Sequence, residues 1–255
     1  MPSRWLIRLA HPDPASCRPG WLHAVVSFWL DPDETAHRGG GQKGWAISPI
    51  AEYDDGIGFE VGIVDDRLLD HLHAGVGIAA ASGIRLGPLQ VQLDTTHDPG
   101  GVECLGAQAW DELADTPRCG GVDLEFRTPT GFRAKNHWSA LPTFARVFGS
   151  YRSRWRAFAP ELEPRLAFDE VVDASPVVAL ETGVFNLLGR EVRGTTGRLV
   201  FELVNATPDQ ELAVAALAAV ALYGGTGGAT TSGMGVTDVT FLAPTGKRDE
   251  HRDRR

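Results

Sequence analysis

Three side chains in the first 45 residues combine proton transfer with positive charge. His37 lies just before a run of three glycines, and Lys43 follows it by six positions. An imidazole exchanges protons near neutral pH, and an ammonium group can neutralise a phosphate without a metal. A third candidate, His23, lies in an apolar segment, where a histidine more often has a structural role. These residue types favour proton transfer at a phosphate as a first hypothesis.

A glycine-rich segment near the carboxyl end is the second candidate for ligand binding. Six of the thirteen residues Tyr223–Gly235 are glycine. The segment follows a predicted helix and precedes a predicted strand, whereas the glycine loops of Rossmann and P-loop proteins run from strand to helix. Closely spaced glycines let backbone N–H groups approach phosphate oxygens, so we expect an anion contact here. The alternative is a flexible connector.

The charge of the chain is unevenly distributed. The formal net charge is -9, but residues 1–120 carry 8 basic and 17 acidic residues and account for all of it. The stretch Arg127–Arg165 carries eight basic and two acidic residues. Within it, the spacing of aromatic residues predicts an amphipathic helix over Phe144–Phe158 with an apolar stripe and a cationic face. A local basic excess of this kind suits a polyanion despite the global sign.

Composition places few other limits on the chain. With 43% hydrophobic and 22% charged residues, 255 residues are expected to fold without disulfides. Cys17, Cys104 and Cys119 have no zinc or disulfide spacing, which favours a reducing cytoplasm. We expect no signal peptide, no membrane span, no metal and no cofactor, because the apolar runs are too short and the histidine spacings do not match metal ligands.

Hydrophobic patterning predicts two βαββαβ units. In the first half we expect strands and helices in alternation, with a short helix after Asp31 that carries His37 near its end. The expected elements of this half are the strands Arg4–Leu9, Trp45–Ile50, Gly58–Val64 and Leu86–Leu93 and the helices Trp21–Leu30 and Arg67–Ala81.

The second half has clearer helix signals. Thr207 and Gln210 form a predicted capping box at the start of a helix over Glu211–Tyr223, which the following glycines end. The expected strands of this half are Val122–Phe126, Leu199–Val204 and Gly235–Leu242. The fold class is therefore α+β, with two tandem ferredoxin-like (βαββαβ, RRM-like) domains at 1–120 and 121–245 and a charged tail at 246–255.

Three segments together resemble one family. They are Phe126–Arg133 (FRTPTGFR), Ala36–Pro49 (AHRGGGQKGWAISP), and the last helix with the glycines that follow it. In this order they are similar to the CRISPR-associated repeat-RNA processing endoribonucleases of the RAMP superfamily, from residue 4 to about 242. The resemblance implies two ferredoxin-like domains with a cleft between them that binds the repeat of precursor CRISPR RNA.

The resemblance also implies a metal-independent reaction and roles for individual residues. The ribose 2′-OH attacks the adjacent phosphodiester and leaves a 2′,3′-cyclic phosphate and a 5′-OH. His37 matches the general base or acid, and Lys43 matches the residue that steadies the phosphorane. Where many relatives have a tyrosine on the first helix this chain has none, so His23 is the candidate replacement. Ala229 stands where relatives often have Lys or Arg.

The candidate RNA-binding residues fall in the basic stretch, beside His37 and in the glycine-rich segment. They are Arg38, Arg127, Arg133, Lys135, Arg146, Arg152, Arg154, Arg156, Gly225, Gly227, Gly228, Thr230, Thr231, Ser232, Gly233 and Gly235.

Two other functions remain open at this point. A protein of the same superfamily can bind guide RNA as a non-catalytic subunit of a CRISPR effector complex. A small-ligand enzyme can use the glycine segment for a nucleotide, although no nucleotide fingerprint accompanies it. The expected partners are repeat RNA and other CRISPR effector subunits, and the expected state is a monomer or homodimer in the cytoplasm.

Overall fold

The computed structural model describes residues 1–244, leaving out 11, 12, 14, 15, 32–40, 97, 135, 136, 168–171, 175, 176 and 188. Three residues singled out in the sequence, His37, Arg38 and Lys135, lie outside the described residues, as do the predicted helix after Asp31 and the tail 246–255. Among the described helices, none is long and apolar enough to cross a membrane.

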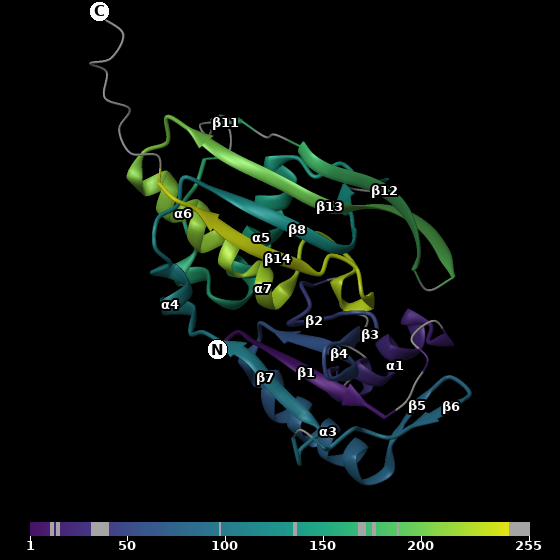
Figure 1. The fold of residues 1–255 in the computed structure, drawn as a ribbon. Coiled ribbons are helices and arrows are strands. Elements are labelled where there is room, and N and C mark those ends of the chain that lie inside the picture. The colour runs from purple at the N-terminus through teal and green to yellow at the C-terminus, as the bar shows by residue number, and fades with distance from the viewer. Residues whose placement is uncertain are drawn as a thin grey trace, which may run out of the picture.

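The first half forms an antiparallel sheet in the order β2-β4-β1-β7, with β3 also paired to β4. Helices α1 and α3 pack against it, and Figure 1 shows this half as the lower layer. Its elements are β1 (Ser3–Leu9), α1 (Pro19–Leu30), β2 (Trp45–Ile47), β3 (Ala51–Tyr53), β4 (Gly56–Ile63), α3 (Leu69–Ser82), β5 (Ile84–Leu86), β6 (Leu89–Val91), β7 (Val102–Ala107) and α4 (Trp110–Ala114).

The predicted fourth strand of this half was wrong. Only the end of the segment Leu86–Leu93 reaches the sheet, where Leu93 bridges Leu9, because Gly87 (φ 61°) turns the chain and makes a separate hairpin of β5 and β6. A Cβ at Gly87 would lie 2.4 Å from the Trp21 ring, so only glycine fits this turn. The fourth strand is β7, which pairs with β1, and its half-exposed, weakly alternating sequence gave no strand signal. The predicted strand Trp45–Ile50 ends early, at Ile47.

The second half repeats the strand order of the first as β11-β13-β8-β14, with β12 also paired to β13. The long hairpin of β12 and β13 extends beyond the sheet in Figure 1, and only the end of β13 was predicted from the sequence. The elements are β8 (Gly121–Thr130), β9 (Phe132–Ala134), β10 (His137–Ser139), α5 (Phe144–Phe158), β11 (Val172–Ala174), β12 (Val177–Leu187), β13 (Arg190–Val204), α6 (Pro208–Ala219), α7 (Ala221–Gly224) and β14 (Thr237–Leu242).

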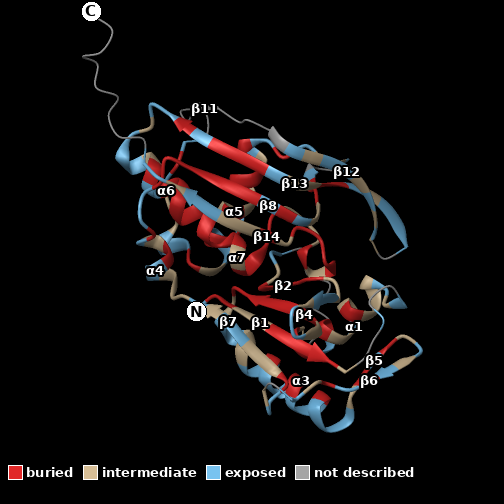
Figure 2. Ribbon diagram, viewed as in Figure 1, coloured by how far each residue is buried: buried red, intermediate tan, exposed pale blue. Residues whose placement is uncertain are grey.

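The shared βαββαβ order confirms the predicted tandem ferredoxin-like fold. Each half has its own hydrophobic cluster, and the central strands β1, β4, β8 and β13 carry most of the buried strand positions in Figure 2. The predicted capping box is present at α6, where Thr207 Oγ1 accepts from the Gln210 amide and Gln210 Oε1 accepts from the Thr207 amide. The sequence therefore specified this helix start locally.

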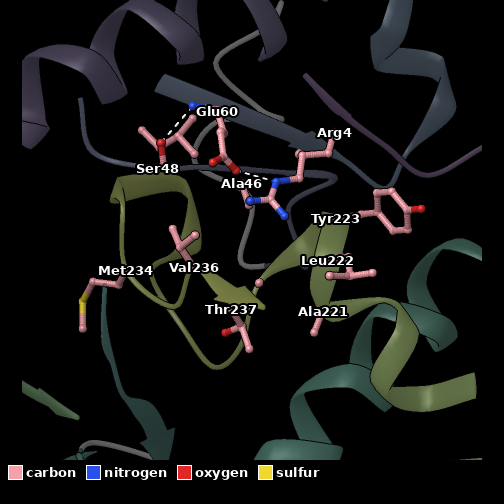
Figure 3. A pocket seen from close by; sticks show the side chains of 13 residues that line it. Arg4, Ala46, Ser48, Glu60, Ala221, Leu222, Tyr223, Met234, Val236 and Thr237 are labelled. Carbon is pink, nitrogen blue, oxygen red and sulfur yellow. Dashed lines mark hydrogen bonds and ion pairs between the residues drawn. The ribbon is translucent and has the colours of Figure 1, made fainter. Parts of the chain in front are cut away.

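The two halves are in direct contact. β4 meets α7 so closely that a Cβ at Gly62 would lie 1.8 Å from the Tyr223 carbonyl oxygen. Beside this contact is a set of charges that we call the interdomain ion cluster, which consists of Arg4 and Glu60 from the first half and Arg127 and Asp238 from the second. Figure 3 shows Arg4 and Glu60 facing the α7 segment around a cavity of about 30 Å³. This contact fixes one half against the other.

Candidate nucleic-acid interface

Residues 224–235, which we call the glycine loop, lie between the two halves. The loop contains a 3-10 turn (Thr230–Ser232) that contacts both α1 and β2 of the first half. Figure 1 shows it as the yellow coil next to β2 and α1. His23, on α1, donates from Nδ1 to the Thr231 carbonyl oxygen at 2.7 Å, because a carbonyl can only accept. The first helix and the glycine loop are thus joined across 208 positions of sequence.

Most amides of the glycine loop are used by the protein itself. Thr226 donates to Gly235 O, Gly228 to Gly131 O and Gly227 to Ser150 Oγ. The later residues of the loop donate within it or to Pro129 O. In the described part of the chain, the amides of Ala229, Thr230 and Thr231 reach no acceptor. An open cradle of amides, the physical reason given above for a phosphate site, is therefore mostly absent.

The glycines serve packing instead. Gly225, Gly227, Gly233 and Gly235 all have φ between 68° and 91°, the left-handed region that a side chain disfavours. A Cβ at Gly227 would lie 2.3 Å from Gly131 O, and one at Gly235 would lie 2.0 Å from Thr226 O. The loop is a compact, largely buried turn whose glycines let it close on itself and on the end of β8.

Lys43 and His23 lie at the same end of the first half, linked through two further side chains. Lys43 Nζ is 3.2 Å from Asp31 Oδ2, and Trp45 Nε1 donates to Asp31 Oδ1 at 3.2 Å. The Trp45 ring in turn stacks on the His23 ring, with centroids 5.7 Å apart. Asp31 ends α1, so the lysine is held where the segment that carries His37 begins.

An open groove of about 310 Å³ lies at the junction, between α5, β9 and the glycine loop. Arg133 and Arg146 line it, together with Gly227 and Gly228 of the loop and Gln42 of the first half. Small residues of α5, including Gly149 and Ser150, form the α5 side. None of the described residues that line it is acidic, so the groove is cationic.

Arg133 and Arg146 both line this groove. Arg133 is exposed on β9. Arg146 donates to Ser139 Oγ at 2.8 Å and to the Leu141 carbonyl at 3.2 Å, and it has no carboxylate partner in the described part of the chain. Among the described residues neither arginine has an ion-pair partner, and the structure brings both to the same groove.

Three other arginines of the basic stretch are ion-paired. Arg127 donates to Glu60 and pairs with Asp238 at 3.1 Å within the interdomain ion cluster. Arg152 and Arg156 both lie within 3.4 Å of Glu163, which follows α5 in sequence. The cationic face predicted for α5 is therefore partly neutralised at its carboxyl end, by a carboxylate that lies outside the helix and beyond its i+4 window.

The predicted apolar stripe of α5 is buried, as expected, but Arg154 is buried with it. Its side chain is 1% exposed, and it donates to the carbonyls of Ser150 and Gly227. It is therefore not part of a solvent-facing cationic surface. Nearby, the Tyr151 hydroxyl meets Thr226 Oγ1 at 2.7 Å, and burial raises the pKa of Tyr151 above its ordinary value.

Sequence reasoning missed two residues that shape the interface. Trp138 lies between the groove and β13, and its Nε1 donates to Arg193 O at 2.6 Å while its ring fills the space beside Gly131 and Gly228. Glu60 anchors the interdomain ion cluster from β4. A carboxylate in an otherwise apolar strand was the available signal for Glu60, because a buried charge needs partners. No local pattern identified Trp138.

The fold and the groove define a class: tandem ferredoxin-like proteins with a basic groove where the two halves meet. Residues 124–237 match the family model of the CRISPR-associated endoribonuclease Cas6. No curated protein matches the chain.

Solved Cas6 structures share the fold over nearly the whole length. A product complex of Thermus thermophilus Cas6 (TTHB231) is 23% identical with a TM-score of 0.73, covering 94% of this chain and 99% of that one. A product complex of Cas6 (TTHA0078) is 23% identical with a TM-score of 0.71 and the same coverage. A Cas6-related protein from Pyrococcus furiosus is 11% identical with a TM-score of 0.62, covering 94% and 99%.

The predicted resemblance to CRISPR-associated endoribonucleases is thereby confirmed over residues 124–237, and the solved Cas6 structures confirm the fold over nearly the whole chain. This chain is similar to Cas6.

Proposed function

We propose that this chain is an endoribonuclease that binds the repeat of precursor CRISPR RNA and cuts it. The family match over residues 124–237 supports an RNA-processing role. Solved Cas6 proteins of the same fold have been captured with a reaction product and with a substrate mimic. The cationic groove gives this chain a surface for a polyanion despite its net charge of -9.

The observation that carries the proposal is the contact of His23 with the Thr231 carbonyl. It fixes α1, whose carboxyl end holds Lys43 through Asp31, against the glycine loop that borders the groove. Gln42, one position before Lys43, itself lines the groove, so a substrate there lies next to the part of the chain that leads into Lys43.

In the proposed reaction, the 2′-OH at the cleavage site attacks the adjacent phosphorus and the 5′-oxygen leaves. The products are a 2′,3′-cyclic phosphate and a 5′-OH. His37 takes the proton from the 2′-OH or gives one to the leaving oxygen, and no metal is required. Lys43 neutralises charge on the non-bridging oxygens. In this arrangement Asp31 orients the ammonium group before RNA binds.

For RNA binding we propose Arg133, Arg146 and the groove side of the glycine loop as the contact surface. The guanidinium groups of Arg133 and Arg146 can donate to phosphate oxygens without first breaking an ion pair to any residue that the structure describes. Three other arginines of the sequence-based set have structural roles: Arg127 joins the two halves, and Arg152 and Arg156 tie α5 to the segment that follows it.

The test uses purified wild-type protein and a labelled RNA carrying one repeat from the CRISPR array of the source genome, in excess EDTA. Cleavage at one position, with a 5′-OH on one fragment and a cyclic phosphate on the other, is the expected outcome. Tight binding without cleavage would instead support a non-catalytic guide-RNA subunit. Thermal stabilisation by a mononucleotide but not by RNA would support a nucleotide enzyme.

The role of His23 is open to a direct comparison. Its Nδ1–H is engaged by the loop, which favours a positioning role over proton transfer. We expect His23→Gln, which keeps a hydrogen-bond donor, to cleave within about tenfold of the wild-type rate. His23→Leu should cleave more slowly, and its free energy of unfolding should be lower by about 1–2 kcal/mol. Equal loss of cleavage in both variants, with folding intact, would instead assign His23 to proton transfer in place of the missing tyrosine.

A further inference from the structure

Arg154 is a buried cation that the reaction above does not use. Its side chain is 1% exposed, and its described partners are two backbone carbonyls, Ser150 O at 3.0 Å and Gly227 O at 3.4 Å. No carboxylate in the described part of the chain forms an ion pair with it. Burial lowers the pKa of Arg154 to about 10, with a smaller contribution of opposite sign from Tyr151.

A buried charge without a carboxylate is costly, and packing alone does not explain it. Replacing such groups by apolar side chains of similar volume is often neutral or stabilising. The other buried side chains of α5 are mainly aromatic and pack in the hydrophobic core, so they do not require a charge at position 154. The missing counter-charge is the feature that requires explanation.

The position of Arg154 indicates where that counter-charge binds. The two residues whose carbonyls accept from it, Ser150 and Gly227, both line the cationic groove. Gly224 leaves room for it, because a Cβ there would lie 2.5 Å from Arg154 Cδ. The guanidinium therefore lies directly behind the wall that α5 and the glycine loop form.

We propose that Arg154 is a positioning residue whose buried charge, acting through this wall, holds an RNA phosphodiester in the groove between α5 and the glycine loop. The inference rests on the proposed function and adds to it. Arg133 and Arg146 contact the RNA backbone from the open side of the groove. Arg154 attracts the same phosphodiester electrostatically through the groove wall, without direct contact. The charge also tethers the loop through the Gly227 carbonyl.

Removing the charge tests the proposal. We expect Arg154→Met and Arg154→Gln to bind a 2′-deoxy, non-cleavable repeat RNA about 5- to 30-fold more weakly, the effect of a unit charge about 8 Å away at an effective dielectric constant of about 20 to 40. The salt dependence of binding should become shallower. Melting temperatures should be unchanged or higher for Arg154→Met. The control is Arg198→Met. Arg198 lies exposed on β13 and pairs with Asp123, and its replacement should change the affinity for RNA less than twofold.

Arg154→Lys separates charge from structure. A lysine in this buried site should have a pKa well below its ordinary value of about 10.4, so it loses its charge as pH rises. RNA affinity of this variant should fall about 5- to 30-fold between pH 6.5 and 8.5 relative to wild type, whose arginine stays charged throughout. A purely structural role of Arg154 would give no such pH dependence.

The proposal would be overturned if Arg154→Met and Arg154→Gln bound repeat RNA with the affinity and salt dependence of wild type. It would also be overturned if Arg154→Lys bound RNA more weakly but with an affinity that does not change with pH. If Arg154→Met does not fold, the Gln and Lys variants decide. Failure of wild type itself to bind repeat RNA would contradict the proposed function rather than this inference.

Discussion

Replacement of His37 by alanine should lower the rate of repeat-RNA cleavage by about 10²- to 10⁴-fold, the usual contribution of a general acid or base. Binding should change little, because the proposed RNA contacts lie on Arg133, Arg146 and the glycine loop. The measurement is single-turnover cleavage of the labelled repeat, with affinity determined separately on the 2′-deoxy RNA.

The control for this experiment is His71→Ala, which removes an exposed histidine from α3. Its cleavage rate should equal that of wild type. The pH profile gives a second readout, since a histidine in proton transfer places an inflection near its pKa that His37→Ala should lose. Undiminished cleavage by His37→Ala would remove the histidine from the proposed mechanism.

Glu60→Gln should lower the free energy of unfolding by about 2–3 kcal/mol and the melting temperature by about 5–10 °C. Glu60 is 4% exposed and accepts from Arg4, Arg127 and Tyr53, so its loss leaves the two guanidinium groups with Asp238 as their one carboxylate partner among the described residues. The range lies below that of a fully buried pair because both arginines are partly exposed. Since the cluster joins the two halves, cleavage should also fall.

The pH dependence of this loss has a definite sign. Burial alone would raise the pKa of Glu60, but hydrogen bonds and charges from Arg4 and Arg127 outweigh it and hold the pKa below its ordinary value. A depressed pKa contributes stability above the unfolded value of about 4.3 and loses it as pH falls through the folded value. The difference between wild type and Glu60→Gln should thus be full at pH 7 and shrink as the pH falls below about 4.

Denaturant unfolding at pH 7 and at pH 3 measures both effects. Asp66→Asn provides the control, because Asp66 pairs with the N-terminal amino group at 3.2 Å, both groups are more than half exposed, and such surface pairs contribute about 1 kcal/mol or less. An equal loss in the two variants would show that the interdomain ion cluster behaves like an ordinary surface pair.

Local sequence patterns predicted the elements whose causes are themselves local. The capping box of Thr207 and Gln210 and the aromatic stripe of α5 depend on neighbours three or four positions away, and both are present. The predicted helix over Trp21–Leu30 and the strand over Arg4–Leu9 are present for the same reason. The glycine turn at Gly87 was missed because what requires it, the Trp21 ring, lies 66 positions earlier.

The arginines show where local patterns end. Arg127, Arg146 and Arg154 look alike in the sequence, yet one joins the halves, one lines the groove and one lies buried behind it. Their partners are set by tertiary contacts such as Glu60, 67 positions away from Arg127. Charge count predicted a basic region but could not say which charges remain available.

The sequence alone predicted the order of the two βαββαβ units and the family resemblance and led to the proposed location of the chemistry, because hydrophobic period, capping and glycine spacing act over a few residues. Only the tertiary structure decided that the glycine loop closes on itself, that His23 joins it to α1, and which arginines face the groove. Those outcomes depend on burial and on ion pairs between distant segments, and both exist only once the two sheets have packed together.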